Sequence, residues 1–369
     1  MSQPADLIDR LRLIRTPGIG PVAYRQLLLR FGSAEAALAA VPDLARRGGG
    51  KTPTIYPVGR AEQEIEAVER LGARYLSIGL GLYPRSLAQL EDAPPLLTVK
   101  GSLALLDRPM VAIVGARNAS AAACRFARGL AHDLGREGVT VVSGLARGID
   151  SAAHDGSLDS GTIAVIAGGI DNFYPPENEA RQRDIAERGL LVAEMPPGTE
   201  PRARHFPYRN RIIAGLAAGT VVIEAAPQSG SLITARLAAE AGREVMAVPG
   251  SPLDPRAQGC NQLIRDGATL IQTAADVMES ITHLNGKVAS PSRSFEHRAV
   301  EHRETPLLEP EPDIRLQVED LLGPSPVPVD EIVRLAGVEP GAVQLVLLEL
   351  DLAGRLDRHA GNKVSIRSA

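Results

Sequence analysis

The sequence predicts an α/β fold in which helices cover both faces of a doubly wound, mostly parallel sheet. Three observations predict this fold. Short apolar runs suited to buried strands recur between about residues 60 and 285, helical patterns separate these runs, and glycine-containing loops follow them. A strand, a helix and a further strand repeated in this order wind into one sheet through right-handed crossovers.

The strand prediction depends on six apolar runs, at residues 110–115, 139–144, 162–169, 190–195, 220–225 and 244–250. Two of the segments between them, AAACRFARGLAHDLGREG and LITARLAAEAGR, have the apolar spacing of amphipathic helices. The sheet and its helices are therefore expected within residues 60–285.

Composition divides the chain into four parts. Residues 1–50 have the pattern of short amphipathic helices and end at a break of three glycines, Gly48 to Gly50. Residues 60–285 form the predicted α/β domain, and residues 286–312 are polar, rich in proline and glutamate, and typical of a flexible linker. Residues 313–369 resume helical patterning and form the last predicted domain.

The overall composition limits the classes of function. The net charge is −4, so a nucleic-acid site would have to be a local basic patch. Two cysteines form no disulfide framework and show no metal-ligand spacing. The N-terminus lacks the apolar core of a signal peptide, and no apolar run is long enough to cross a membrane. We expect a cytoplasmic protein without a membrane partner.

The loops after the predicted strands carry the candidate ligand-binding residues. Ligands bind at the carboxyl ends of the strands in such sheets, where glycines allow close approach and helix N-termini attract anions. These loops supply Gly115, Arg117, Ser143, Gly144, Gly148, Asp150, Asn178, Ser229, Gly230 and Ser231. Together they predict a phosphate-binding crevice longer than one nucleotide needs, with Arg117 as the strongest ligand candidate. Ser229 is also predicted to cap the helix that follows it.

A second basic cluster precedes an apolar helix, in the stretch RARHFPYRNRIIAGL. It contains Arg202, Arg204, His205, Phe206, Arg209, Asn210 and Arg211. Asn210 is expected to cap the helix, with arginines facing anions at its positive end. Residues two apart do not share a helix face. One of Arg209 and Arg211 is therefore expected to be structural, through Glu194 or Glu224, and the other to face the ligand.

Catalytic motifs are sparse. The first strand is followed by GARNAS and not by G-x-G-x-x-G, and neither a P-loop nor a G-x-S-x-G nucleophile elbow is present. No cluster resembles a zinc or two-metal site. We expect no enzymatic activity, no cofactor and no metal.

Six motifs in this order resemble the DNA-processing protein A (DprA/Smf) family: GARNAS, VVSGLARGIDSAAH, AGGIDNFYPPEN, HFPYRNRIIAGL, VIEAAPQSGSLITA and AVPGSPLDPRAQGCNQLI. The resemblance implies an extended Rossmann-like domain that binds single-stranded DNA and forms a homodimer. It also implies a role in protecting DNA and loading RecA during natural transformation in competent cells and in recombination, without catalysis.

The family's functional residues map onto this sequence by motif. The DNA-contacting arginine falls on Arg117, and the glycine-rich loop falls on Ser143, Gly144, Gly148 and Asp150. The last motif falls on Phe206, Pro207, Arg209, Asn210 and Arg211. Many members have a DNA-binding lysine after the Tyr-Pro pair, where this chain has Pro176. Either Arg181, Arg183, Arg202 or Arg204 supplies the missing charge, or affinity is lower.

The flanking segments also resemble known domains. TPGIGPVAYRQLLLRFGS is similar to a helix-hairpin-helix or SAM-like domain, for which DNA contact and a structural or dimer role stay open. Residues 313–369 resemble a winged helix. Its would-be recognition helix has no basic residue and contains Glu349 and Asp351, so a protein-contact or regulatory role is favoured.

Two other classes of function are considered. A nucleotide-processing phosphoribohydrolase uses a similar sheet and would make Glu224 catalytic, although its P-G-G-x-G-T-x-x-E motif is missing. A pure interaction scaffold would bind no DNA at low salt. The surfaces that dimerise or contact RecA, and binding to double-stranded DNA, stay open.

Overall fold

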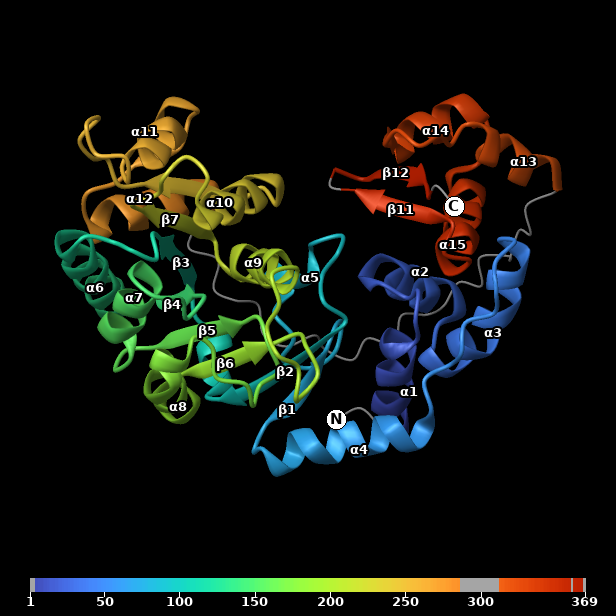
Figure 1. The fold of residues 1–369 in the computed structure, drawn as a ribbon, viewed down its shortest axis with the longest axis horizontal. Helices are drawn as coiled ribbons and strands as arrows, with labels where there is room; N and C mark the ends of the chain where they lie inside the picture. Colours follow the sequence, from blue (N-terminus) through green and yellow to red (C-terminus); the bar gives the residue numbers. More distant parts are fainter. Residues whose placement is uncertain (1–3, 286–311, 360, 368–369) are drawn as a thin grey trace. The chain divides into compact units, whose positions relative to one another are not determined.

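The computed structural model describes residues 4–285, 312–359 and 361–367 (Figure 1). The chain forms two compact units, one of Glu64–Glu296 and one that combines Met1–Gln63 with His297–Ala369. The predicted linker at 286–312 lies outside the described residues, apart from its last residue. No helix within the described ranges is long and apolar enough to cross a membrane.

A single sheet forms the centre of the unit Glu64–Glu296. Nine strands of the described chain pair in the order β1-β2-β6-β5-β4-β3-β7-β8-β9. Their bounds are β1 Arg74–Ser77, β2 Leu96–Gly101, β3 Met110–Gly115, β4 Thr140–Ser143, β5 Thr162–Ile166, β6 Leu190–Ala193, β7 Gly219–Ile223, β8 Glu244–Ala247 and β9 Thr269–Leu270. β2 pairs antiparallel with β1 and β6, and the remaining pairings are parallel.

The predicted fold class is therefore confirmed. All six apolar runs form strands, β3 to β8. β1, β2 and β9 were not predicted, and they extend the sheet at its two edges.

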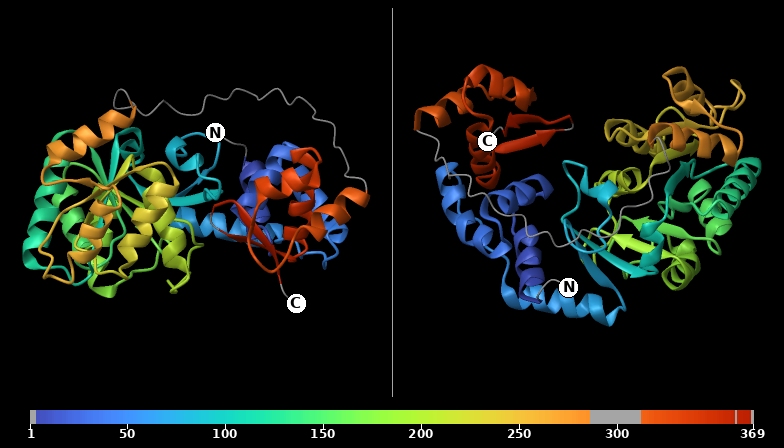
Figure 2. Two further views of the ribbon diagram at one scale, coloured as in Figure 1. Left: turned by 90° about the horizontal axis from the view of Figure 1, so that it is seen from above. Right: turned by 180° about the vertical axis from the view of Figure 1, so that it is seen from behind.

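Helices cover both faces of this sheet (Figure 2). Because neighbouring strand residues point to opposite faces, Ala112 and Val114 of β3 belong to one core cluster, whereas Val111 and Ile113 belong to another. The first face is covered by α5 Arg85–Ala88, α9 His205–Leu216, α10 Gly230–Glu240 and α11 Gln258–Arg265, and the second by α6 Ala121–Arg136, α7 Ile149–Ser157, α8 Glu179–Arg188 and α12 Ala274–Asn285. The short helices η1 Leu103–Asp107 and η2 Pro176–Asn178 complete the unit.

The order of the strands places a crevice at one edge of the sheet. β3 and β7 are neighbours in the sheet, with Gly115 opposite Ile223 at their carboxyl ends. From β3 the chain continues through α6 to β4 on one side, and from β7 it continues through α10 to β8 on the other. The two connections diverge at this point, and such switch points open a crevice at the strand ends.

The second unit contains the first and last parts of the chain. Its N-terminal part consists of α1 Pro4–Arg15, α2 Pro21–Phe31 and α3 Ala34–Arg47, and α4 Val58–Arg70 contains the boundary to the central unit. Its C-terminal part consists of α13 Pro312–Asp320, α14 Val329–Ala336, α15 Pro340–Leu352 and a sheet of β10 Val327–Pro328, β12 Lys363–Ile366 and β11 Leu356–His359. α15 packs on α13 and also on α3 and α2 (Figure 1).

Candidate nucleic-acid interface

A groove of about 960 Å³ lies at the carboxyl ends of β3 and β7. Its walls come from the loops after these strands and from the first turns of α9 and α10. A smaller pocket of about 270 Å³ shares Arg117, Phe206 and Arg209 with the groove and extends to Ile166 at the end of β5. The structure thus places a long crevice where the sequence predicts one.

Arg117 is the exposed cation of this groove. It follows β3 directly and, among the described residues, its side chain donates no hydrogen bond and joins no ion pair. Its guanidinium carbon lies 5.4 Å from the centre of the Phe206 ring, within cation–π distance. Tyr174, which is 45% exposed, packs against the same ring at 5.7 Å between ring centres. The aromatic contact orients the Arg117 guanidinium and leaves its donors available.

Arg209 lies deeper in the same groove. It is buried, and its Nη1 donates to the backbone oxygens of Gly144 at 2.5 Å and Val165 at 3.3 Å. Its guanidinium carbon is 5.8 Å from the Phe206 ring centre. Arg209 therefore ties the ends of β4 and β5 to α9 and adds positive charge to the floor of the groove.

The glycine-rich loop after β4 is held by Asp150. The Oδ2 atom of Asp150 accepts hydrogen bonds from the backbone nitrogens of Gly144 at 3.2 Å and Ala146 at 3.3 Å. Burial raises the pKa of Asp150, and the positive charge of Arg209 and the two amides oppose that rise. Although Asp150 lines the groove, its carboxylate is used to shape the loop.

Two glycines of this loop have no room for a side chain. A Cβ atom on Gly144 would lie 1.5 Å from Nη1 of Arg209. Gly148 caps α7 with a φ of +73°, and its Cβ would lie 2.2 Å from the carbonyl oxygen of Ala116. Gly148 thus allows the loop after β4 to pack directly on the loop that carries Arg117.

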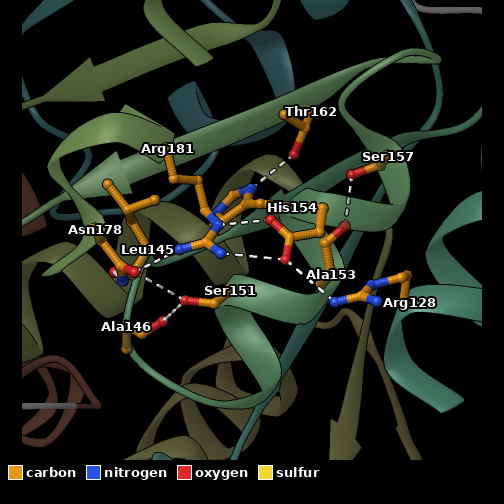
Figure 3. A network of polar contacts seen from close by, with 11 residues as sticks. Arg128, Leu145, Ala146, Ser151, Ala153, His154, Ser157, Thr162, Asn178 and Arg181 are labelled. Atoms are coloured by element: carbon orange, nitrogen blue, oxygen red, sulfur yellow. Dashed lines mark hydrogen bonds and ion pairs between the residues drawn. The ribbon is translucent and has the colours of Figure 1, made fainter. Parts of the chain in front are cut away.

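Ser143 and Asn178 do not line the groove but stabilise backbone at and around the glycine-rich loop after β4. Ser143 is fully buried and donates from Oγ to the carbonyl oxygen of Ile113 at 2.6 Å. Asn178 donates from Nδ2 to the carbonyl oxygen of Leu145 at 2.8 Å, where the backbone has a positive φ of 56°. Arg181 in turn donates to Oδ1 of Asn178 at 2.5 Å (Figure 3). Ser143 and Asn178 therefore each fix a backbone carbonyl group by a hydrogen bond.

The network in Figure 3 continues to a buried histidine. Nδ1 of His154 lies 2.7 Å from Oγ1 of Thr162, and the ring is fully buried. Burial, together with the positive charge of Arg181, lowers the pKa of His154 to about 3. His154 is therefore neutral in the folded protein over the physiological range.

This lowered pKa predicts acid sensitivity. The unfolded chain protonates His154 near its ordinary pKa of 6.5, whereas the folded chain resists protonation until about pH 3. The stabilising contribution of neutral His154 is present above pH 6.5 and is lost as pH falls. We expect the free energy of unfolding of the central unit to drop by up to about 1.4 kcal/mol per pH unit below pH 6.5 from this group.

Urea unfolding at pH 7, 6, 5 and 4.5 measures this dependence. His154→Gln should flatten the profile, whereas the same change at exposed His132 of α6 should leave it as in the wild type. Equal slopes for wild type and His154→Gln would contradict the prediction.

The start of α9 corrects the prediction for Asn210. The helix begins at His205, so Asn210 lies in its interior and caps nothing, and the capping residue Arg204 makes no side-chain cap bond. Proline is tolerated in the first turn of a helix, where Pro207 lies. Asn210 is buried and lines the groove. Arg202 and Arg204 are exposed just before the helix. His205 is buried, and its burial together with the positive charges of Arg204 and Arg202 lowers its pKa.

Arg211 is structural. It is buried, and it donates to Oε1 of Glu194 at 2.5 Å and to the backbone oxygen of Asp92 at 2.5 Å. This confirms the pairing with Glu194 that the sequence analysis considers. Arg211 does not line the groove, whereas Arg209 does.

The loop after β7 forms the opposite wall. Ser229 caps α10 by accepting from the backbone nitrogen of Ser231, as predicted, and Gly230 is exposed at the groove. Glu224 has a positive φ of 50°, and its carboxylate accepts from the backbone nitrogen and Oγ of Ser120 at 2.8 and 2.6 Å. Glu224 therefore fixes the N-terminus of α6 and does not line the groove.

Tyr174 was missed by the sequence reasoning. Tyr174 lies in the loop after β5 and Phe206 lies in the first turn of α9, and the two rings meet at the groove. The available signal was a tyrosine directly ahead of two prolines, in a loop that follows a buried strand.

Comparison with known proteins identifies the family. A family model for DNA recombination-mediator protein A matches residues 74–282, more than half of the chain. The chain belongs to the DprA/Smf family. Models for the DprA-like N-terminal HHH domain and the DprA winged helix domain match residues 4–67 and 302–362. Both flanking domains of this DprA/Smf chain are therefore as the resemblance implies.

Individual DprA proteins agree with this assignment. DNA processing protein DprA of Streptococcus pneumoniae is 48% identical over 255 residues, covering 68% of this chain and 90% of that protein. The X-ray structure of DprA from Streptococcus pneumoniae has a TM-score of 0.62 at 37% identity, covering 76% of this chain and 98% of that one. DNA processing protein A from Helicobacter pylori, whose structure was described for its single-stranded DNA binding mode, has a TM-score of 0.53 at 29% identity, covering 58% and 97% of the two chains.

Proposed function

We propose that this DprA/Smf chain binds single-stranded DNA in the groove at the ends of β3 and β7, without catalysis. In this proposal it forms a homodimer through the Rossmann-like unit and helps to load RecA during natural transformation and recombination. The observation that carries the proposal is Arg117, an exposed cation that joins no ion pair among the described residues and is held over Phe206. The single-stranded DNA binding described for the Helicobacter pylori relative supports it.

The groove offers three kinds of contact to a single strand. Arg117 supplies charge for the phosphates, and Arg209 adds to the positive field from below. The exposed start of α10 at Gly230 presents backbone N–H groups, which favour anions at a helix N-terminus. Tyr174 and Phe206 offer aromatic faces to bases. Since phosphate contacts position a strand without reading it, sequence preference should be weak.

The charge missing at Pro176 is proposed to come from Arg202 and Arg204. Arg181 already pairs with Asp155 at 2.6 Å, and Arg183 pairs with Glu179 at 2.6 Å. Arg202 and Arg204 are exposed and join no ion pair among the described residues. Arg204 has a weak 3.4 Å contact with the His205 ring. These two arginines are therefore the available ones of the four candidates.

Arg117→Ala tests the site. We expect single-stranded DNA affinity to fall by about 10- to 100-fold, because a charge-assisted hydrogen bond contributes about 1.5–3 kcal/mol. The slope of log affinity against log salt concentration should become shallower by about 0.7 for each phosphate that the variant no longer neutralises. Gel shifts or fluorescence anisotropy at several salt concentrations measure both quantities.

Arg136→Ala is the matched control. Arg136 is exposed in the last turn of α6, at the far end of the helix from the groove, and the substitution removes the same charge. Its single-stranded DNA affinity should stay within about twofold of the wild type, and the slope of log affinity against log salt concentration should stay unchanged. If Arg117→Ala behaved like this control, the groove would not be the DNA site.

The alternative, a nucleotide-processing hydrolase, needs a reactive carboxylate at Glu224. Glu224 is engaged with Ser120 and does not line the groove, which argues against this role. Incubation of the protein with nucleoside monophosphates, followed by chromatography for released base, distinguishes the two functions. Release of base by wild type that is abolished in Glu224→Gln would support the hydrolase.

A further inference from the structure

The third helix of the winged-helix part of the chain, α15, has apolar residues on two faces. Val343, Val346, Leu347 and Leu350 belong to the core cluster of the winged helix itself. Leu345, Leu348 and Leu352 follow a separate helical stripe outside that cluster, yet each is at most 3% exposed. A helix that is apolar all round must be covered on both sides. The helices that cover the second face are α3 and α2, which contact α15.

Two glycines of the Gly48–Gly50 segment pack directly against the backbone of α15 and the residue after it. A Cβ atom on Gly48 would lie 2.0 Å from the carbonyl oxygen of Glu349, and one on Gly50 would lie 2.4 Å from that of Ala353. Gly48 has a φ of −71°, and Gly50 is not among the residues with positive φ, so neither backbone requires glycine by itself. The close approach of α15 is what excludes a side chain at both positions.

Polar contacts fix the same interface. Nε2 of Gln26 in α2 donates to Oε1 of Gln344 in α15 at 2.7 Å. Arg355, just after α15, donates to the carbonyl oxygen of Gly48 at 3.0 Å and to Glu319 of α13 at 3.0 Å. The contact therefore combines apolar burial, backbone fit and directed hydrogen bonds, as specific protein interfaces do.

We propose that the winged helix of this chain is a protein-binding domain whose partner is the chain's own N-terminal helical domain, and that α15 serves this contact and does not read DNA. Winged helices that read DNA place the second helix of their helix-turn-helix, which corresponds to α15, in the major groove. Here both faces of α15 are occupied, and the acidic residues Glu349 and Asp351 pair with Arg315 and Arg358. The proposal is independent of the groove at β3 and β7.

Gly48→Ala in the full chain tests the docking. Its Cβ would force α3 and α15 apart by about 1 Å to reach even a 3.0 Å contact. We expect amide hydrogen exchange to accelerate by about tenfold or more in both segments 44–50 and 345–353, with the central unit unchanged. The controls are Gly341→Ala in α15 and Gly59→Ala in α4, where an added Cβ meets nothing within 4 Å.

A charge pair tests the same contact without any steric clash. Gln26→Glu combined with Gln344→Glu places two carboxylates together and should accelerate exchange in both segments. Gln26→Glu combined with Gln344→Lys differs only at position 344 and should restore the slow exchange. Equal exchange in both double variants, or wild-type exchange in Gly48→Ala, would overturn the docking.

Duplex DNA distinguishes a protein-binding domain from a concealed DNA reader. Gel shifts compare wild type, Gly48→Ala and Gly341→Ala on a random duplex of about 30 base pairs, which is roughly three helical turns. The proposal expects the same duplex affinity for all three. A several-fold gain confined to Gly48→Ala would mean that α15 binds DNA once released, and the assignment as a protein-binding domain would be wrong.

Discussion

Gly148→Ala should lower both the stability of the central unit and its affinity for single-stranded DNA. The backbone of Gly148, at φ +73° and ψ −120°, lies in a region that residues with a side chain rarely adopt, which costs alanine about 1–3 kcal/mol. The Cβ would also lie 2.2 Å from the carbonyl oxygen of Ala116 and 2.8 Å from that of Arg117. Because backbone cannot yield as a flexible side chain can, we expect the free energy of unfolding to fall by about 3 kcal/mol or more.

The loss of affinity follows from the position of the clash. The loop that must move carries Arg117, so its guanidinium would leave the Phe206 ring. We expect single-stranded DNA affinity to fall about as far as in Arg117→Ala, by about 10- to 100-fold. Chemical denaturation and fluorescence anisotropy on the same preparation measure both effects.

Gly138→Ala is the control for a positive φ without a steric clash. Gly138 follows α6 with a φ of +78°, and an added Cβ meets nothing within 4 Å. It should lose about 1–2 kcal/mol of stability and keep its DNA affinity. Similar results for Gly138→Ala and Gly148→Ala would show that contact between the two loops contributes nothing.

Arg211→Ala should destabilise the central unit strongly while sparing the DNA site. Arg211 and Glu194 are an almost buried ion pair, with side chains 5% and 16% exposed. Removing the arginine takes the ion-pair partner away from the nearly buried Glu194 carboxylate, and breaking a buried pair in this way costs about 3–5 kcal/mol. The folded fraction should bind single-stranded DNA as the wild type does, because Arg211 does not line the groove.

Two further variants make this result specific. Arg183→Ala removes an equal charge from an exposed pair with Glu179 and should change stability by about 0.5 kcal/mol or less. Replacing both partners, as Arg211→Met with Glu194→Leu, should recover much of the loss because no buried charge remains. A stable Arg211→Ala protein with weak DNA binding would instead make Arg211 the DNA-contacting arginine.

The sequence was sufficient to predict the parallel part of the sheet. β3 to β7 are buried on both faces and β8 is buried over its second half, so their apolar runs are continuous and visible without a partner strand. β1 is four residues long and starts exposed, and β9 has two residues. β2 pairs with β6, about 90 positions further along the chain, and nothing local in the sequence announces that pairing.

Side-chain partners were harder to predict than loops. The spacing of Arg209 and Arg211 indicates opposite roles, but the partners that decide between them, Gly144 and Glu194, come from distant strands. The Asn210 cap prediction failed because a helix can include proline in its first turn, and α9 begins at His205, six residues before the start that a cap at Asn210 would give. The three glycines after α3 were interpreted as a break, since the helix that packs on them is about 300 residues away.

The pairing of α15 with α2 and α3 also has a consequence for the order of events during synthesis. Gln26 and Gln344 are 318 positions apart, and the whole central unit lies between them in the chain. A ribosome releases the N-terminal helices first, and domains generally fold as they emerge. Here the surface of α2 and α3 that receives α15 must stay uncovered until almost the entire chain has been translated. The first residues made are thus among the last to reach their final packing, and every nascent chain passes through a stage in which that apolar surface is open to other proteins.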